Sequence, residues 1–261
     1  MVVGTSVMGR PIPDGSACCY RRVGRGATMR VISWNMGCAM AAYRPSHDEA
    51  WRYLVDELRP DLALVQETLL TPSVHLGSRG RLSARGAWSR TKDWGSAVYA
   101  PTLPIEDVTT IDTEGVHACS TTITTAEGPL VAVSLHVSTV DDQSARLAAV
   151  ADGLATVASA QRMIIAGDFN AARRFDEVYP GMNYGKFFER MREVGFFECH
   201  WRLHGREVQT FWGKQTIEAY QDDHFFVNED LGAKVTSCSA IDNAVVRRLS
   251  DHAPLELVID L

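Results

Sequence analysis

Polar and ionisable side chains occur at several separated points of the 261-residue chain, each beside a short apolar run. Strand interiors favour β-branched and aromatic residues over carboxylates and amides, so these side chains mark strand ends. They are Asn35, Glu67, His136, Asp168, Asn170, Asp223, Asp251 and His252. Charged groups near a core are costly unless they pair or bind a metal. The set therefore indicates metal binding and proton transfer at the ends of strands.

Taken singly, each of these residues has an ordinary structural explanation. An Asn after a strand is usually a turn residue, and a lone Glu there is usually solvated. A single His in a β-run, such as His136, is more often a satisfied core residue than a catalyst. These explanations account poorly for the joint occurrence, in which every residue lies beside its own strand.

After residue 29 the chain alternates between predicted strands and predicted helices, which must position these side chains. Apolar runs predict strands at 31–34, 62–65, 95–100, 117–124, 130–137, 163–166, 196–202, 208–212, 224–228, 234–240 and 254–260. A helix is predicted after Ser46, with Ser46 and Glu49 as a capping box and Pro60 as its stop. Further helices are predicted at Asp142–Ala160 and around Phe187–Val194, the latter ended by Gly195. Many strands with few helices indicate an α+β fold in which two sheets pack together with helices outside.

Composition places the chain among ordinary globular proteins, with 46% hydrophobic and 22% charged residues. Residues 1–28 are rich in Gly, Arg and small side chains and lack a period, which predicts a flexible extension before a catalytic domain over 29–261. No apolar run reaches the roughly 18–20 residues that span a bilayer. We expect a soluble monomer with no membrane partner.

Charge and cysteine usage limit the partners. The net charge of −6 disfavours nucleic-acid binding by bulk attraction, so a polyanion would need a local basic patch. The six cysteines form no C-x-x-C pair and no zinc-finger spacing, which suits a reducing cytoplasm.

The order of the polar segments resembles one known family. The segments are Ser33-Trp34-Asn35, Gln66-Glu67, Ser134-Leu135-His136, Gly167-Asp168-Phe169-Asn170, Asp223-His224-Phe225-Phe226-Val227 and Ser250-Asp251-His252, together with Thr210-Phe211-Trp212. In this order they resemble the endonuclease/exonuclease/phosphatase superfamily, which includes DNase I, abasic-site endonucleases and inositol polyphosphate 5-phosphatases. The resemblance runs from about residue 30 to residue 261. It implies a DNase I-like four-layer α/β/β/α sandwich with the site at one edge of the two sheets.

The resemblance and the residue types together imply a metal site. Mg²⁺, or Mn²⁺ in its place, prefers oxygen ligands and needs only one or two carboxylates. Glu67 is the first expected ligand, with Asn35 beside it and Asp251 as a further ligand. No Cys/His cluster suggests zinc instead.

The remaining site residues are expected to handle the proton and the phosphoryl group. His252 is the candidate base because histidine titrates near neutral pH, and the resemblance implies that Asp223 orients it. Asp168 would position the attacking water, and Asn170 would hold a phosphoryl oxygen. His136 would contact the phosphate or protonate the leaving group, and it argues against the abasic-site branch, which tends to carry tyrosine there.

Asp222 and Asp223 are adjacent, and only one of them should face the site. Counting back from Phe225 in the family pattern selects Asp223. Period-2 alternation would then turn Asp222 away.

Substrate contacts are expected from arginines near these segments. Arg79, Arg81 and Arg85 lie in a glycine- and serine-containing cationic segment over 77–92, which would either contact phosphates or form a solvated surface loop. Arg173 and Arg174 would bind a second phosphate or pair with Asp176 and Glu177.

Three functions follow from this pattern. The first is a metal-dependent nuclease that hydrolyses phosphodiester bonds of DNA or RNA. The alternative is a phosphatase or phosphodiesterase for a small phosphorylated molecule, such as a nucleotide, phosphosugar or lipid head group. A catalytically inactive binding module is disfavoured because Glu67, Asp168, Asp223 and His252 are all present.

Overall fold

The strands of the protein form two mixed sheets. The computed structural model describes residues 28–69, 93–113, 115–139, 142–157, 161–179, 181–213 and 220–261. Within these ranges the first sheet contains, in spatial order, β10 (Val235–Ala240), β11 (Leu255–Asp260), β1 (Thr28–Asn35), β2 (Leu62–Leu69) and β3 (Trp94–Tyr99). The second contains β4 (Ile105–Thr113), β5 (Val116–Thr125), β6 (Gly128–Val137), β7 (Met163–Asp168), β9 (Asp223–Asn228) and β8 (Phe196–Glu198).

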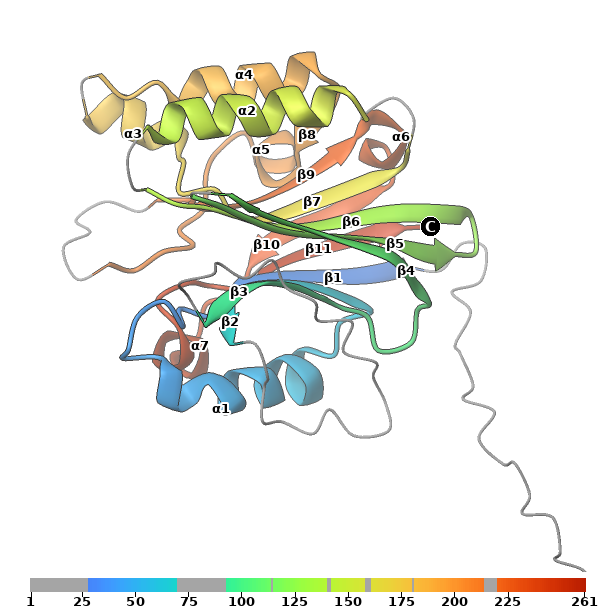
Figure 1. Ribbon diagram of the computed structural model, residues 1–261, viewed down its shortest axis with the longest axis vertical. Coiled ribbons are helices and arrows are strands. Elements are labelled where there is room, and N and C mark those ends of the chain that lie inside the picture. The colour runs from blue at the N-terminus through green and yellow to red at the C-terminus, as the bar shows by residue number, and fades with distance from the viewer. Residues whose placement is uncertain are drawn as a thin grey trace, which may run out of the picture.

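Helices cover the outer face of each sheet (Figure 1). The helices of the described ranges are α1 (His47–Arg52), α2 (Gln143–Ala155), α3 (Arg173–Val178), α4 (Tyr184–Glu193), α5 (Cys199–His204), α6 (Glu229–Gly232) and α7 (Ala244–Leu249). Of these, α5 and α6 also reach the core between the sheets through Cys199 and Leu231. A 3₁₀ turn over Arg44–Ser46 precedes α1, and a π-helical segment over Tyr53–Leu58 continues it. None of the helices in the described ranges combines the length and the apolar character needed to span a bilayer.

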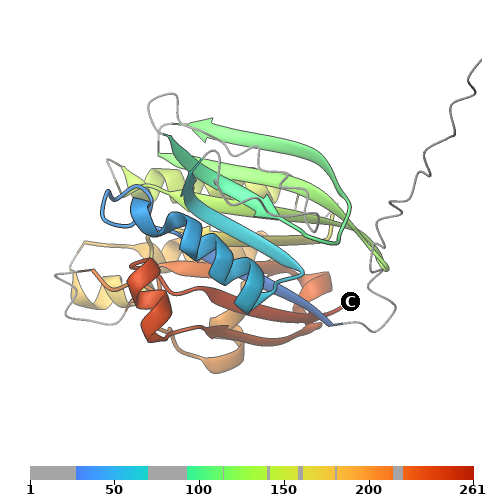
Figure 2. The same cartoon turned by 90° about the horizontal axis from the view of Figure 1, so that it is seen from below.

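The layers are α/β/β/α, as the sequence predicted. The helices α2 and α4 lie on the outer side of the second sheet, and α1 and α7 lie across the outer side of the first, which Figure 2 shows from below. The expected four-layer α/β/β/α sandwich is therefore confirmed.

Strand alternation builds the three apolar layers of this sandwich. In β7, Ile164 packs between the two sheets while Ile165 packs under α2 and α4. In β1, Val31 faces the space between the sheets while Ile32 packs under α1. Successive residues point to opposite faces of a strand, so each strand serves two cores at once.

Strand register brings the predicted polar residues to one edge of the sandwich. The strands β1 and β2 run parallel with Asn35 opposite Gln66, and β11 runs antiparallel to β1 with Leu255 opposite Ser33. The ends of β1 and β2 therefore meet the start of β11. In the second sheet Asp168 lies opposite both His136 and Asp223, so the ends of β6 and β7 meet the start of β9.

The two sheets are joined close to this edge by a pair of polar side chains. Gln66 Nε2 on β2 donates to Ser134 Oγ on β6 at 2.9 Å. Ser134 Oγ in turn donates to the carbonyl of Val65 at 2.8 Å. These bonds fix the position of one sheet against the other immediately behind the polar residues.

Three local predictions were wrong. Residues 199–202 belong to the helix α5, because the Glu198 carboxylate accepts from the amides of His200 and Trp201 and caps that helix. Residues 208–212 form no strand and pair only through single bridges of Phe211 with Tyr220 and His252. Ser46 precedes α1, but its hydroxyl donates to the Tyr43 carbonyl, so the capping box does not form.

Candidate active site

His252 and Asp223 form a buried pair at the edge where the strand ends meet. His252 Nδ1 lies 2.8 Å from Asp223 Oδ2, and both residues are buried. Burial alone lowers the pKa of His252, but Asp223 and Asp168 more than reverse this and raise it well above its ordinary value. With Nδ1 bonded to Asp223, the second ring nitrogen, Nε2, is the one available for proton transfer.

Asp168 lies at the centre of the cluster. Its Oδ2 accepts from Asn35 Nδ2 at 2.8 Å, and its Oδ1 accepts from the Asn170 amide at 2.8 Å. The same Oδ2 lies 3.8 Å from His252 Nε2 and 3.8 Å from His136 Nε2. Burial raises the pKa of Asp168 to about 6, with the nearby Asp223 carboxylate also raising it and His252 opposing.

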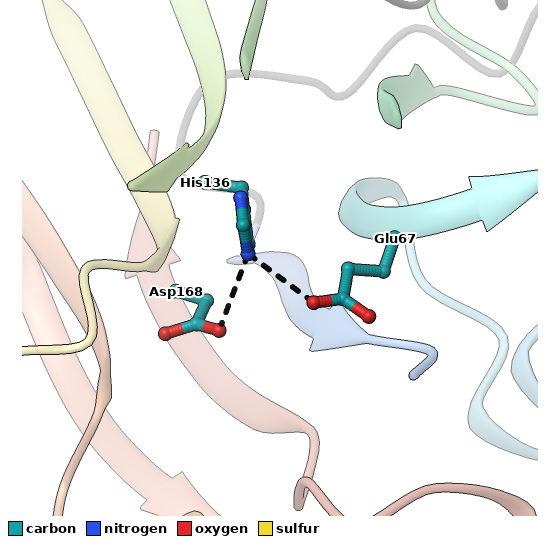
Figure 3. Close-up of side chains that lie close together, drawn as sticks. All are labelled: Glu67, His136 and Asp168. Atoms are coloured by element: carbon teal, nitrogen blue, oxygen red, sulfur yellow. Dashed lines mark ion pairs between the residues drawn. The ribbon is translucent and has the colours of Figure 1, made fainter. Parts of the chain in front are cut away.

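Glu67 approaches Asp168 from the other sheet, with His136 between them (Figure 3). His136 Nε2 lies 3.2 Å from Glu67 Oε1. Burial raises the pKa of Glu67, but His136, His252 and the Ala39 amide together outweigh it, and the pKa falls to about 2. Carboxylate oxygens and the ring nitrogen of Glu67, His136 and Asp168 lie within 4.8 Å of one another, which is the spacing of a group able to hold a metal ion.

Two site residues have strained backbones. Glu67 has φ +45° and Asn170 has φ +50°, a region that residues other than glycine rarely adopt. Glu67 lies where the register between β2 and β3 shifts between Val65 and Thr68. Such irregularities re-aim a side chain at the end of a strand, and they persist where surrounding structure fixes them. Asn170 is fixed by its Nδ2, which donates to the Val137 carbonyl at 2.9 Å.

The turn that follows β1 gathers the other predicted metal ligands. Asn35 Oδ1 accepts from the Gly37 amide at 2.9 Å, and Glu67 Oε2 accepts from the Ala39 amide at 2.9 Å. Gly37 has φ +67°, and a Cβ there would come within 3.0 Å of Asp251 Oδ1. The turn therefore contacts Asn35, Glu67 and Asp251, and the absence of a side chain at residue 37 permits the close approach to Asp251.

Two hydroxyls position the His252–Asp223 pair. Thr210 Oγ1 accepts from the amides of Asp222 and Asp223 at 3.0 and 3.1 Å. Ser250 Oγ accepts from the His252 amide at 3.0 Å and donates to the Asn35 carbonyl at 2.7 Å. Both residues belong to the family-like segments Thr210-Phe211-Trp212 and Ser250-Asp251-His252, but the sequence analysis predicted no role for either.

The surroundings of His136 were also missed. Its ring stacks on that of His117, with centroids 5.7 Å apart, and the ring of Trp94 meets it edge-on at 5.3 Å. His117 lies directly opposite His136 in the β5–β6 pairing. A hairpin register drawn from the predicted strands could have suggested this neighbour.

Asp222 is buried but has a different environment from Asp223. It is 4% exposed, and burial raises its pKa to about 8, with Asp168 contributing. His224, two residues on, packs with Phe169 and Phe188 in the layer beneath α4. Phe225, two residues after Asp223, packs between the sheets. Alternation therefore separates Asp222 from Asp223, and Asp223 is the one paired with His252.

A family model described as the Endonuclease/Exonuclease/phosphatase family matches residues 32–252. The chain belongs to this family. The endonuclease/exonuclease/phosphatase family comprises hydrolases of phosphate esters. No curated protein sequence matches the chain.

Solved structures share the fold of this family member at low sequence identity. A 3′ phosphatase from Neisseria, NExo, bound to a product DNA hairpin, matches with a TM-score of 0.66 and 15% identity over 89% of this chain and 100% of its own. D. rerio TDP2, complexed with a single-strand DNA product, gives 0.69 and 12% over 90% and 100%. The AP endonuclease LMAP from Leishmania major gives 0.65 and 16% over 90% and 88%.

The structure describes two of the five arginines predicted to contact substrate in this family member, and it places both in contacts outside the cluster. Arg79, Arg81 and Arg85 lie outside the described residues. Arg174 Nη1 pairs with Glu177 at 2.6 Å, as the structural alternative expected. The Arg173 guanidinium lies 3.8 Å from the ring centroid of Phe188 and 4.3 Å from that of Trp201, in the helical layer.

Proposed function

We propose that this chain is a divalent-metal-dependent phosphodiesterase that acts on DNA or RNA. The observation that supports this best is the meeting of the His252–Asp223 pair with Asp168 and Glu67 at one edge, where both sheets contribute. A base held by a carboxylate, beside further carboxylates, suits the activation of water for attack on phosphorus.

The residues of the site fit a divalent metal. The family generally depends on such ions, and the described residues contain carboxylate and histidine groups spaced to hold one. Around Gly37 the side-chain donors are oxygens, from Glu67, Asp251 and Asn35, which is the chemistry that Mg²⁺ or Mn²⁺ favours. We assign Glu67 as the principal ligand, with Asn35 and Asp251 as further donors. A divalent ion bound there would neutralise charge developing on the phosphoryl and leaving oxygens.

The chain's own residues divide the proton chemistry. His252 Nε2 would accept the proton of the attacking water while Asp223 holds Nδ1 and stabilises the resulting imidazolium. The surrounding carboxylates favour the protonated ring, so the neutral form that a base requires depends on neutralising part of their charge. Asp168 Oδ2, 3.8 Å from Nε2, lies where it would orient the water.

Asn170 and His136 are assigned to the phosphoryl group. The Asn170 side-chain amide uses one hydrogen on the Val137 carbonyl and has a second to donate to a phosphoryl oxygen. His136 Nε2, between Glu67 and Asp168, would hydrogen-bond the phosphate or protonate the leaving oxygen.

The choice of nucleic acid as substrate is supported by two of the similar structures, which hold DNA: NExo with a product hairpin and TDP2 with a single-strand product. A small phosphorylated molecule is the second candidate, because a chain with net charge −6 repels a long polyanion.

A substrate panel tests the proposal. The full chain is assayed with Mg²⁺ or Mn²⁺ on single-stranded and duplex DNA, RNA, nucleotides and an aryl phosphodiester, with Glu67→Ala and His252→Ala as controls. We expect cleavage of nucleic acid that is abolished by EDTA and by either substitution. Activity that survives chelation would remove the metal assignment, and turnover of nucleotides alone would replace the nuclease with a small-molecule phosphatase.

A further inference from the structure

A second pocket lies in the helical layer on the outer side of the second sheet. It has a volume of about 560 Å³ and is lined by residues of α4, β8 and α5 together with Arg173, the first residue of α3. These helices lie on one side of that sheet (Figure 1). The pocket contains none of the residues assigned above to the metal, the proton or the phosphoryl group. A cavity of this volume is within the range of small-molecule sites.

Three arginines line the pocket without a carboxylate partner. They are Arg173, Arg192 and Arg202. Among the residues that the structure describes, no carboxylate oxygen lies within 4 Å of their guanidinium groups. Neighbouring arginines outside the pocket differ: Arg174 pairs with Glu177, and Arg190 pairs with Asp152 and Glu193.

Arg173 is held with an unsatisfied donor. Its guanidinium is stacked between the rings of Phe188 and Trp201, which fixes its plane. Its Nη1 is buried and has no hydrogen-bond partner in the described part of the chain. Burial lowers the pKa of Arg173, and Glu198 and Glu207 partly offset this. A buried guanidinium N–H without an acceptor costs free energy that an anionic ligand would recover.

The two glutamates that line the pocket, Glu189 and Glu198, form no direct ion pair with the described guanidinium groups of these arginines. Glu198 is engaged elsewhere, since its carboxylate caps α5 and accepts from Gln221 Nε2 at 3.0 Å. His224 Nδ1 also lies 3.4 Å from it. Glu189 is exposed and forms no ion pair with the three arginines. Within the described residues, the three arginines of the lining therefore outnumber its two glutamates, and none of the three is held in a direct ion pair.

We propose that this pocket is a phosphate-binding site, separate from the catalytic cluster, that takes a phosphate group of a nucleotide or of a nucleic-acid strand. Guanidinium groups match the geometry of phosphate oxygens and bond them in pairs. Arg173 lines the pocket with its guanidinium held between two rings, and Arg192 and Arg202 line it with exposed side chains. The site goes beyond the proposed hydrolysis and does not depend on it.

Calorimetric titration of the full chain tests this site. EDTA is present throughout, so no metal-dependent turnover enters the measurement. The titrants are inorganic phosphate, a nucleoside monophosphate and a single-stranded oligonucleotide. The variants are Arg192→Gln and Arg202→Gln. The matched control is Lys186→Gln, an exposed cation on the helix of Arg192 that does not line the pocket and forms no ion pair with a described residue. The exposed arginines are used because truncating the stacked Arg173 would also disturb packing.

We expect each arginine variant to weaken binding about tenfold, because charged hydrogen bonds of this kind contribute that much, and Lys186→Gln to leave it within about twofold. If the arginine variants already bind inorganic phosphate more weakly, the phosphate group alone is sufficient for binding at this site. A loss seen only with the oligonucleotide would identify the strand backbone as the ligand. Equal losses in all three variants, or no loss in either arginine variant, would overturn the site.

Discussion

At the scale of single residues, the cluster depends on which nitrogen of His252 faces which carboxylate. Asp223 lies at hydrogen-bond distance from Nδ1, whereas Asp168 lies 3.8 Å from Nε2. The first contact is close enough to fix the ring, and the second is too long for a direct hydrogen bond, so a water lying beside both atoms could bond each of them. The two neighbours of one imidazole therefore have different tasks.

Separate substitutions of the two adjacent aspartates, Asp222 and Asp223, test whether the contact of Asp223 with Nδ1 is the functional one. We expect Asp223→Asn to lower kcat/KM by about 10²- to 10⁴-fold, because it removes the charge that orients and stabilises the His252 imidazolium. Asp222→Asn should change kcat/KM by less than about twofold, because at pH 7 the Asp222 carboxyl, with its pKa raised to about 8, is already largely neutral. Steady-state kinetics of both variants make the comparison, and the reverse ranking would show that the register is wrong by one residue.

The identity and order of these residues could be predicted from the sequence, but their contacts could not. A family pattern supplies residue types at strand ends, so Glu67, Asp168 and His252 were expected together. It carries no information on side-chain direction. The contact of His136 with Glu67, the stack on His117 and the Thr210 bonds to the Asp222 and Asp223 amides depend on strand register and on a backbone bulge.

At the scale of elements, the strand that carries Asp168 approaches β6 unusually closely. Gly167 has φ +151°, and a Cβ there would lie 1.8 Å from the Leu135 carbonyl oxygen. No side chain fits this space, so the β6–β7 pairing that places His136 opposite Asp168 requires glycine.

Replacing Gly167 with alanine should strongly destabilise the protein. We expect Gly167→Ala to lower the free energy of unfolding by at least about 3 kcal/mol, because backbone must move away from backbone. The matched control is Gly153→Ala in α2, where a Cβ meets nothing within 4 Å. This control should raise the free energy of unfolding by about 0.5–1 kcal/mol. Urea titrations of both variants measure the effects, and a Gly167→Ala protein of unchanged stability would contradict the close approach.

The packing of α1 against β2 depends on a neutral histidine. His47 Nε2 lies 3.1 Å from Trp51 Nε1, 3.2 Å from the Leu69 amide and 2.9 Å from Thr68 Oγ1. Nε2 accepts hydrogen bonds from the first two groups, so the ring must be unprotonated at this atom. Burial accordingly lowers the pKa of His47 to about 4, against a smaller raising effect of Asp48.

This histidine should make stability depend on pH. Between about pH 6.5 and 4 the unfolded chain binds a proton at His47 that the folded chain does not, so stability falls as pH falls, by up to about 3 kcal/mol. The wild-type advantage over His47→Gln should therefore shrink across this range, while titrations of other groups cancel in the difference. Chemical denaturation of both proteins at several pH values measures it, and a constant difference would exclude this role.

Most strands could be predicted because alternation and apolar runs follow the two faces of a sheet. The failures lie where a helix cap or the lack of a partner strand outweighs strand-like composition. Residues 199–202 have strand-like composition, yet the Glu198 carboxylate bonds the first free amides and starts α5. Residues 208–212 have the composition of a strand but find only single bridging partners.

At the scale of the whole molecule, the net charge of −6 opposes the proposed substrate unless positive groups are gathered locally. Oligonucleotide binding should then depend steeply on salt, with a log–log slope of about −2 or steeper if three or more phosphates are contacted. Titrations from low to high ionic strength with EDTA present measure the slope. A slope near zero would favour the compact substrate of the alternative function.

The split of the reactive groups between two sheets has a further consequence. Glu67 lies on β2 of the first sheet, His252 lies just before β11 of the same sheet, and Asp168 and Asp223 lie on the second sheet. The Gln66–Ser134 hydrogen bond joins the two sheets behind them. Catalytic activity should therefore depend on how the two sheets pack against each other. On gradual heating, we expect catalytic activity to be lost at a lower temperature than the far-UV circular dichroism signal of the helices and strands. A small shift of one sheet against the other would separate the site residues before either sheet unfolds.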